Sequence, residues 1–116
     1  MDNLLTIALE AHNPERNHHR RYEITVGRDL FGAWTVGVRY GRVGRGGQEL
    51  RYGAEHAAAM QKIVRERLKD RQSAPRRIDC RYRLVRCEVA PEMDAYEWLP
   101  ADLREAFDGE VGKTAG

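Results

Sequence analysis

The spacing of apolar residues changes twice along the chain, and these changes restrict the fold more than any other feature. Before residue 55, apolar and polar side chains alternate, which is typical of strands that bury one face. Between residues 57 and 68 the apolar side chains recur at helical spacing, and after residue 78 alternation returns. This order predicts an α+β fold: an antiparallel β-sheet of about five strands with one long helix packed on one face.

Four strands are expected before the helix. The alternating runs place them at residues 4–10, 22–26, 34–40 and 48–52. The polar segment 12–21 has no periodicity and is expected to be a loop. Gly44, Gly46 and Gly47 predict the hairpin turn between the third and fourth strands, because glycine adopts positive φ at no steric cost. Gly41 lies inside the third strand, where a glycine indicates a bulge or a close approach of two backbones.

The helix and the last strand follow from the second half of the pattern. The apolar stripe of the helix is formed by Ala57, Met60, Val64 and Leu68. Residues 73–75 close the helix, because they end in a proline. The run from Ile78 to Val89 alternates again with one change of parity near Leu84, which predicts a fifth strand with a slip or bulge at that point.

The length of 116 residues favours a single domain. The apolar run Leu4–Leu9 is far shorter than the roughly 20 residues that a membrane-spanning helix needs. The N-terminus lacks the basic start and apolar run of a secretory signal, so a cytoplasmic location without membrane association is the default expectation. Cys80 and Cys87 lie roughly 23 Å apart in an extended strand, at about 3.3 Å per residue, which is too far for a disulfide. Both are expected to be half-buried thiols in a reducing compartment.

The net charge of +2 conceals two oppositely charged segments. Residues 1–87 carry 18 basic and 10 acidic side chains, whereas residues 88–116 carry 2 basic and 8 acidic ones. We therefore divide the chain into a domain over residues 1–89 and an acidic C-terminal tail over residues 90–116, in which residues 100–107 could form a short helix. The asymmetry favours an anionic partner for the basic part. Seventeen of the 20 basic residues are arginine, which suits phosphate, although a GC-rich genome favours arginine codons whatever the function.

A hairpin rich in arginine and glycine is the candidate binding site. Guanidinium groups and exposed backbone N–H groups can bind phosphates there, while an aromatic ring stacks on a sugar or base. The candidate contact residues are Arg20, Arg21, Arg39, Tyr40, Arg42, Arg45 and Arg51. We expect them to form one positive surface. The alternative is an ordinary structural turn whose charges are only solvated.

Three segments carry a resemblance to a known family. The segment Trp34–Gly44 contains Tyr40-Gly41-Arg42 and is followed by Gly47-Gln48 and a helix. Upstream lie Asn17–Tyr22 and Asp29–Gly32. In this order the three segments resemble the core, the start of the second strand and the preceding loop of the WGR domain, a family named for a Trp-Gly-Arg triplet. The resemblance covers roughly residues 1–89, and Tyr40 stands in place of the triplet's tryptophan.

The resemblance implies a sheet packed with a helix, no catalytic activity, and a role as a nucleic-acid or interdomain contact module. In poly(ADP-ribose) polymerases this domain helps to engage DNA ends, which implies that Tyr40 stacks on a terminal sugar and that Arg42 bridges to a neighbouring domain. Tyrosine has a smaller ring that stacks less strongly than tryptophan. No second domain is expected in the 116 residues, so Arg42 has no bridging partner within them.

These observations give two functional hypotheses. The first is a non-enzymatic nucleic-acid-binding module, with DNA as the expected ligand and with the acidic tail folding back over the basic face to compete with it. The second is a protein-interaction adaptor without nucleic-acid affinity, which docks another protein through Leu99–Phe107 in the tail or through the glycine-rich hairpin. No cofactor or metal is expected: Gly112-Lys113-Thr114 lacks the upstream glycine of a P-loop, and His18-His19 has no metal-ligand spacing.

Overall fold

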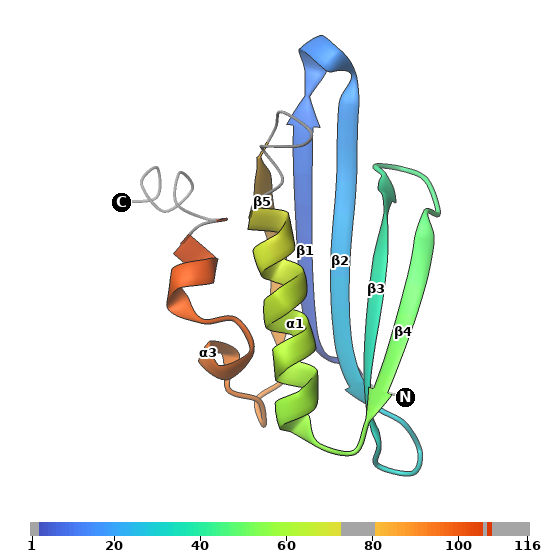
Figure 1. Cartoon of the computed structure of the whole chain (residues 1–116), viewed down its shortest axis with the longest axis vertical. Helices are drawn as coiled ribbons and strands as arrows, with labels where there is room; N and C mark the ends of the chain where they lie inside the picture. Colours follow the sequence, from blue (N-terminus) through green and yellow to red (C-terminus); the bar gives the residue numbers. More distant parts are fainter. Residues whose placement is uncertain (1–2, 73–80, 106, 108–116) are drawn as a thin grey trace.

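A computed structural model describes residues 3–72, 81–105 and 107 of the chain (Figure 1). Its elements are β1 (Asn3–Asn13), the 3-10 turn η1 (Pro14–Arg16), β2 (His18–Arg28), β3 (Trp34–Arg42), β4 (Gln48–Ala54), α1 (Ala57–Gln72), β5 (Tyr82–Val89) and α3 (Ala95–Trp98). The strands of these described residues form one antiparallel sheet in the order β4-β3-β2-β1-β5, and α1 packs on one of its faces. The predicted α+β class is confirmed.

The core lies between α1 and the apolar face of the sheet. The alternation in the sequence places every second residue of the central strands on this face, and the helical stripe meets them. These buried side chains are Leu5, Ile7, Leu9, Tyr22, Ile24, Val26, Trp34, Val36, Val38, Met60, Val64 and Leu68. Burial of each large apolar side chain stabilises the fold by about 1.5–3 kcal/mol. This layer therefore determines which face of the sheet packs against α1.

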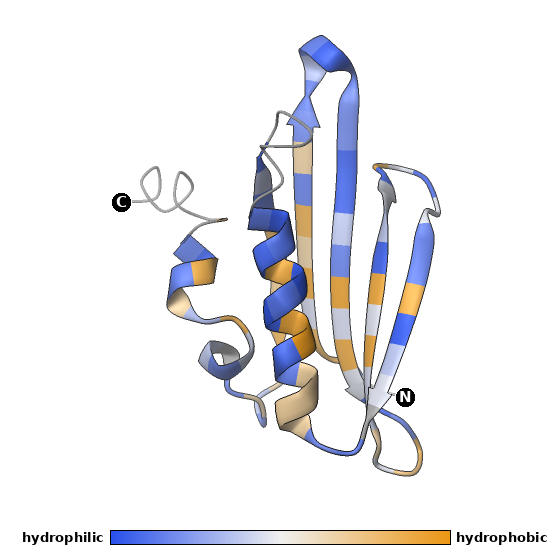
Figure 2. Cartoon of the chain, in the orientation of Figure 1, coloured by the Kyte–Doolittle hydropathy of each residue, from blue (hydrophilic) through white to orange (hydrophobic). Residues whose placement is uncertain are grey.

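The segment 12–21, predicted as a loop, is the distal part of a long hairpin, so that prediction was wrong. β1 and β2 pair without a break from Leu5 opposite Val26 to Asn13 opposite His18. Only η1 and Asn17 form the turn, and Asn17 adopts a left-handed φ of 55° that asparagine tolerates. This end of the hairpin extends past the end of α1 and is hydrophilic on both faces (Figures 1 and 2), so its residues show no alternation.

The predicted irregularity in the last strand is confirmed. Ala8 pairs with Arg86 and Leu9 with Leu84, which leaves Val85 as the extra residue of a β-bulge. Cys87 carries a half-buried thiol, as expected, whereas Cys80 and the first predicted residues of this strand lie outside the described part of the chain.

The described part of the acidic segment belongs to the core. Residues 101–105 and 107 are helical, in agreement with the predicted short helix. Trp98, Leu99, Leu103 and Phe107 are each 2% exposed and join the same apolar cluster as the sheet. This part runs along α1 on the side away from the β3–β4 hairpin (Figure 1), so over the described residues the expected fold-back onto the arginine-rich hairpin was wrong. In the described chain, no helix has the length and apolar character needed to cross a membrane.

Candidate nucleic-acid interface

The Tyr40-Gly41-Arg42 triplet ends β3 in regular pairing with β2. Tyr22 lies opposite Tyr40, and Arg20 lies opposite Arg42, without a bulge at Gly41. A Cβ atom on Gly41 would lie 2.8 Å from the Cα of Gly47 in the following turn. Gly41 therefore marks a close approach of two backbones, the second of the two alternatives that the sequence left open.

The turn itself requires glycine. Gly47 has a φ of +67°, and a Cβ atom there would collide with the carbonyl oxygen of Tyr40. Val43 donates its backbone N–H to the carbonyl oxygen of His19 at 2.9 Å, which fastens the start of the turn to β2. The geometry at the end of β3 is therefore fixed by backbone contacts on both sides.

Regular pairing places the triplet's side chains on the helix side of the sheet. Tyr40 and Arg42 have the same parity as the buried Trp34, Val36 and Val38 of their strand. The tip of the β1–β2 hairpin extends past the end of α1 (Figure 1), and Arg71 in the last turn of α1 contacts Tyr22, the strand partner of Tyr40. Arg42 is exposed and Tyr40 is half-buried. Arg20, opposite Arg42, is also exposed on this side.

Arg42 is held by the tip of the β1–β2 hairpin. Its two terminal nitrogens donate to Asn17, one to the backbone carbonyl oxygen and the other to the side-chain oxygen, each at 3.0 Å. Both acceptors are uncharged. The contact therefore orients the guanidinium without neutralising its charge.

Aromatic rings of the sheet contact Tyr40 and two arginines of α1. The rings of Tyr22 and Tyr40 stack with centroids 6.4 Å apart, and the Cζ atom of Arg71 lies 4.7 Å from the centre of the Tyr22 ring. Arg67 lies over Tyr52 and donates to its hydroxyl. Burial raises the pKa of Tyr22 to about 12, although the positive charges of Arg71 and Arg67 act in the opposite direction.

Sequence reasoning missed Arg67 and Arg71. The signal was present, because these residues follow the buried Val64 by three and seven positions and therefore flank the apolar stripe of the helix. We call the surface formed by Arg20, Tyr40, Arg42, Arg67 and Arg71 the basic patch. Arg45 lies in the adjoining turn and is exposed.

Within the described chain, no ion pair neutralises the arginines of the basic patch or the neighbouring Arg45. None of Arg20, Arg42, Arg45, Arg67 and Arg71 forms an ion pair with a carboxylate among the residues that the structure describes. The side chains of Arg20 and Arg45 form no hydrogen bond within the described chain either. The exposed guanidinium groups of Arg20, Arg42 and Arg45 are therefore available to an anion, whereas Arg67 and Arg71 are half-buried against tyrosine rings.

The other predicted arginines lie on the opposite face of the sheet. Arg21, Arg39 and Arg51 have the opposite parity and point away from the helix. The expectation of one positive surface was therefore wrong, because a strand directs successive side chains to opposite faces. This parity separates Arg39 from its neighbour Tyr40 and Arg21 from its neighbour Arg20.

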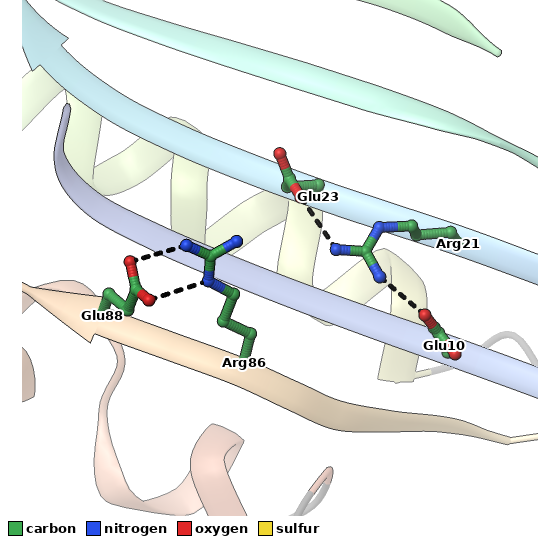
Figure 3. A network of polar contacts seen from close by, with 5 residues as sticks. All are labelled: Glu10, Arg21, Glu23, Arg86 and Glu88. Atoms are coloured by element: carbon green, nitrogen blue, oxygen red, sulfur yellow. Dashed lines mark hydrogen bonds and ion pairs between the residues drawn. The ribbon is translucent and has the colours of Figure 1, made fainter. Parts of the chain in front are cut away.

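Glutamates on the same or the neighbouring strand pair with arginines on this open face. Arg21 contacts Glu10 at 2.6 Å and Glu23 at 3.0 Å, and Arg86 forms two 2.9 Å hydrogen bonds with Glu88 (Figure 3). Arg39 and Arg51 share Glu49, at 3.3 and 2.9 Å. These four arginines and four glutamates carry no net charge. Hydrogen bonds from His12 and Arg21 lower the pKa of Glu10, so this carboxylate stays ionised.

Comparison with known proteins identifies the family. The family model of the WGR domain matches residues 5–74, which include β1 to β4, the Tyr40-Gly41-Arg42 triplet and α1. A comparison with curated protein sequences gives no match. WGR domains are a non-catalytic family of the nucleic-acid-binding type. Since the match spans more than half of the 116 residues, the chain belongs to the WGR domain family.

Proposed function

We propose that this protein binds nucleic acid, with DNA as the preferred ligand, and acts without catalysis of its own. The observation that carries the proposal is the unequal charge of the two faces of one sheet. Arg20, Arg42, Arg45, Arg67 and Arg71 have no carboxylate partner among the described residues. On the open face, by contrast, Arg21, Arg39, Arg51 and Arg86 pair with glutamates. Membership of the WGR family supports the same function.

The basic patch has the two components that contact with a nucleic acid end or single strand requires. Arg20 and Arg42, together with Arg45 in the adjoining turn, offer guanidinium forks to phosphate oxygens, and such contacts position a strand without reading its sequence. Tyr40 offers a ring for stacking on a sugar or base. Arg42 is oriented by Asn17 before any ligand arrives, which lowers the entropy that binding costs.

The assignment narrows the set of contact residues. Arg20, Tyr40, Arg42 and Arg45 are proposed as contacts, joined by Arg67 and Arg71 from α1. Arg21, Arg39 and Arg51 are proposed to stabilise the open face through their glutamates. The ion pairs of Arg39 and Arg51 are exposed, so each contributes at most about 1 kcal/mol.

Two double variants with the same change in charge test the assignment. Arg20→Gln with Arg45→Gln removes two arginines that have no partner in the described chain, and Arg39→Gln with Arg51→Gln removes two that share Glu49. Fluorescence anisotropy titrations would use blunt duplex, nicked duplex and single-stranded DNA, and duplex RNA, at several salt concentrations. If about four phosphates are contacted, log K should fall against log salt with a slope of about −3 to −4.

The first variant is expected to weaken binding and to reduce the steepness of the salt dependence by about 2, whereas the second leaves both nearly unchanged. Equal losses in the two variants would reject the basic patch as the contact surface. An unchanged anisotropy with all four ligands at low salt would reject nucleic-acid binding itself.

One form of the alternative function is not supported. An adaptor that docks through Leu99–Phe107 needs the apolar side chains of that segment on the surface. Leu99, Leu103 and Phe107 are each 2% exposed and pack in the protein's own core. These side chains therefore stabilise the fold and are not exposed to a partner.

A further inference from the structure

A second surface lies at the other end of the molecule from the basic patch. A cleft of about 640 Å³ is enclosed by the loop between β2 and β3, the first turns of α1 and residues 92–98. In Figure 1 this loop and the start of α1 lie at the end of the sheet opposite the β3–β4 turn. The volume is within the range of about 300–1,000 Å³ that is typical of ligand sites.

Part of the cleft is lined by apolar side chains. Trp34 and Trp98 lie beneath it with ring centroids 5.5 Å apart, and Leu4 and Met93 line its wall. Trp98 and Met93 belong to the C-terminal segment, which lies outside the match to the WGR domain at residues 5–74. The cleft therefore depends on residues that the family match does not include.

The loop beside the cleft presents two large apolar side chains to solvent. Leu30 is 91% exposed and Phe31 is 95% exposed. One carboxylate oxygen of Asp29 accepts the backbone N–H groups of Phe31 and Ala33, at 2.9 and 3.0 Å, so the loop is held in this form. Neighbouring exposed apolar side chains beside an apolar cleft are typical of a protein-docking surface.

The rim of the cleft is acidic. Asp29, Glu92, Asp94 and Glu97 line it, and none forms an ion pair within the described residues. The one arginine in the lining, Arg28, stacks on Trp34 with its Cζ atom 4.3 Å from the ring centre. These five charges leave a net charge of −3, which disfavours nucleic acid and favours a cationic ligand.

We propose that this cleft docks a short segment of a partner protein in which apolar residues alternate with lysine or arginine. An apolar side chain would be buried between Phe31, Leu30 and Met93, while flanking cations would face Glu92 and Glu97. The two ends of the molecule then bind different classes of partner. This inference does not depend on nucleic-acid binding by the basic patch.

A second copy of this chain fits less well. The segment of a second copy that best matches this description contains the exposed Val85, which lies between Arg83 and Arg86 in the sequence. Val85 belongs to β5, however, which is paired with β1, and Arg86 is already bound to Glu88. Docking of that segment would require the neighbouring ion pair to be broken. A separate peptide has no such cost.

The chain's two tryptophans make the test specific. Both Trp34 and Trp98 line the cleft, so intrinsic tryptophan fluorescence reports on this site alone. The probe is a fluorescently labelled synthetic peptide of alternating lysine and leucine. Two matched peptides replace lysine by glutamate or leucine by serine. Binding of the first peptide, with a change in tryptophan emission, and much weaker binding of the other two are expected.

Four variants locate the site. Phe31→Ser alters the loop beside the cleft and Glu92→Lys alters its rim, both at exposed positions, and each should weaken binding by about tenfold, which corresponds to about 1.4 kcal/mol. Val85→Ser likewise replaces an exposed apolar side chain by serine, and Glu66→Lys makes the same charge reversal, both elsewhere on the surface, and they should leave binding unchanged. Equal losses in all four, or tight binding of the glutamate peptide, would overturn the proposal. A dimer in sedimentation that Phe31→Ser dissociates would instead assign the cleft to a second copy.

Discussion

The guanidinium of Arg42 is bound at both terminal nitrogens by Asn17, at 3.0 Å to the backbone carbonyl oxygen and at 3.0 Å to the side-chain oxygen. These two residues are 25 positions apart in the sequence, and their contact joins the end of β3 to the tip of the β1–β2 hairpin. Since Asn17 is uncharged, Arg42 is fixed in direction and remains positive. The contact therefore orients Arg42 without neutralising its charge.

The first prediction concerns this contact. Asn17→Gly keeps the left-handed backbone and the carbonyl acceptor but removes the side-chain acceptor. It should weaken nucleic-acid binding by about 0.5–1.5 kcal/mol, the net value of one hydrogen bond. Arg42→Ala should weaken binding further and reduce the steepness of the salt dependence by about 1. Anisotropy titrations at several salt concentrations measure both effects.

The exposed Arg65 on α1 supplies the control for this prediction. Arg65→Ala removes the same charge at a distance from the triplet and should change affinity little. If Arg42→Ala and Arg65→Ala had the same effect, Arg42 would have no role beyond its contribution to net charge.

The second prediction concerns the ring at position 40. Tyr40→Ala should weaken binding of single-stranded DNA by about 1–3 kcal/mol, because the stacking surface is lost. Tyr40→Phe keeps the ring and loses only the hydroxyl's 2.8 Å hydrogen bond to Gln48, so its affinity should stay close to that of the unmodified protein. Tyr40→Trp enlarges the stacking surface and should strengthen binding. Anisotropy measures the affinities, which should decrease from the Trp variant to Tyr and Phe and then to Ala. If the Phe variant bound DNA as weakly as the Ala variant, stacking would be excluded.

The alternation of apolar and polar residues predicted much of the fold. It also indicates which of the candidate site residues lie on each face of the sheet. The same spacing that places Trp34 and Val36 in the core places Tyr40 and Arg42 on the helix side, and directs Arg39 to the other face. What alternation does not contain is the cross-strand partner. Glu49 lies opposite Arg39 only because β3 and β4 pair in one particular register, which depends on the turn between them.

The C-terminal segment shows a second limit of sequence reasoning. Its apolar residues Leu99, Leu103 and Phe107 were recognisable as a helical stripe, but its acidic charge suggested a separate tail. The stripe packs in the core cluster that side chains of the sheet and of α1 form, and no local pattern in residues 90–116 describes that cluster. Tertiary packing therefore decided the position of the segment, and the long-range attraction between opposite net charges did not.

The third prediction follows from this packing. Leu103→Ala should lower the free energy of unfolding by about 2–5 kcal/mol, because it leaves a cavity in the shared core. Asp102→Ala, at an exposed neighbour, should change it by less than about 0.5 kcal/mol. Truncation after Val89 removes Trp98 and Phe107 from the core and should unfold the protein instead of tightening DNA binding. Urea denaturation followed by circular dichroism measures all three, and a stable truncated chain would contradict the assignment of these residues to the core.

The fourth prediction concerns stability in alkali. Burial raises the pKa of Tyr22 from its ordinary value of 10.0 to about 12, because the phenolate would be poorly solvated among the core residues. The folded state therefore holds this proton more tightly than the unfolded state. The resulting stabilisation is complete below about pH 10 and is lost as the pH rises towards about 12. Tyr22→Phe has no proton to lose and should escape this part of the alkaline destabilisation.

The measurement for Tyr22 is a difference between two chains, so that effects of alkali common to both cancel. The urea midpoint of each protein is determined at about pH 8 and at about pH 11, between which only the buried hydroxyl distinguishes the two chains. The unmodified protein should lose more stability than Tyr22→Phe over this interval, even if the variant is less stable at the lower pH. Equal losses would mean that the Tyr22 hydroxyl ionises as readily in the folded protein as in the unfolded chain, with Arg71 and Arg67 compensating fully for its burial.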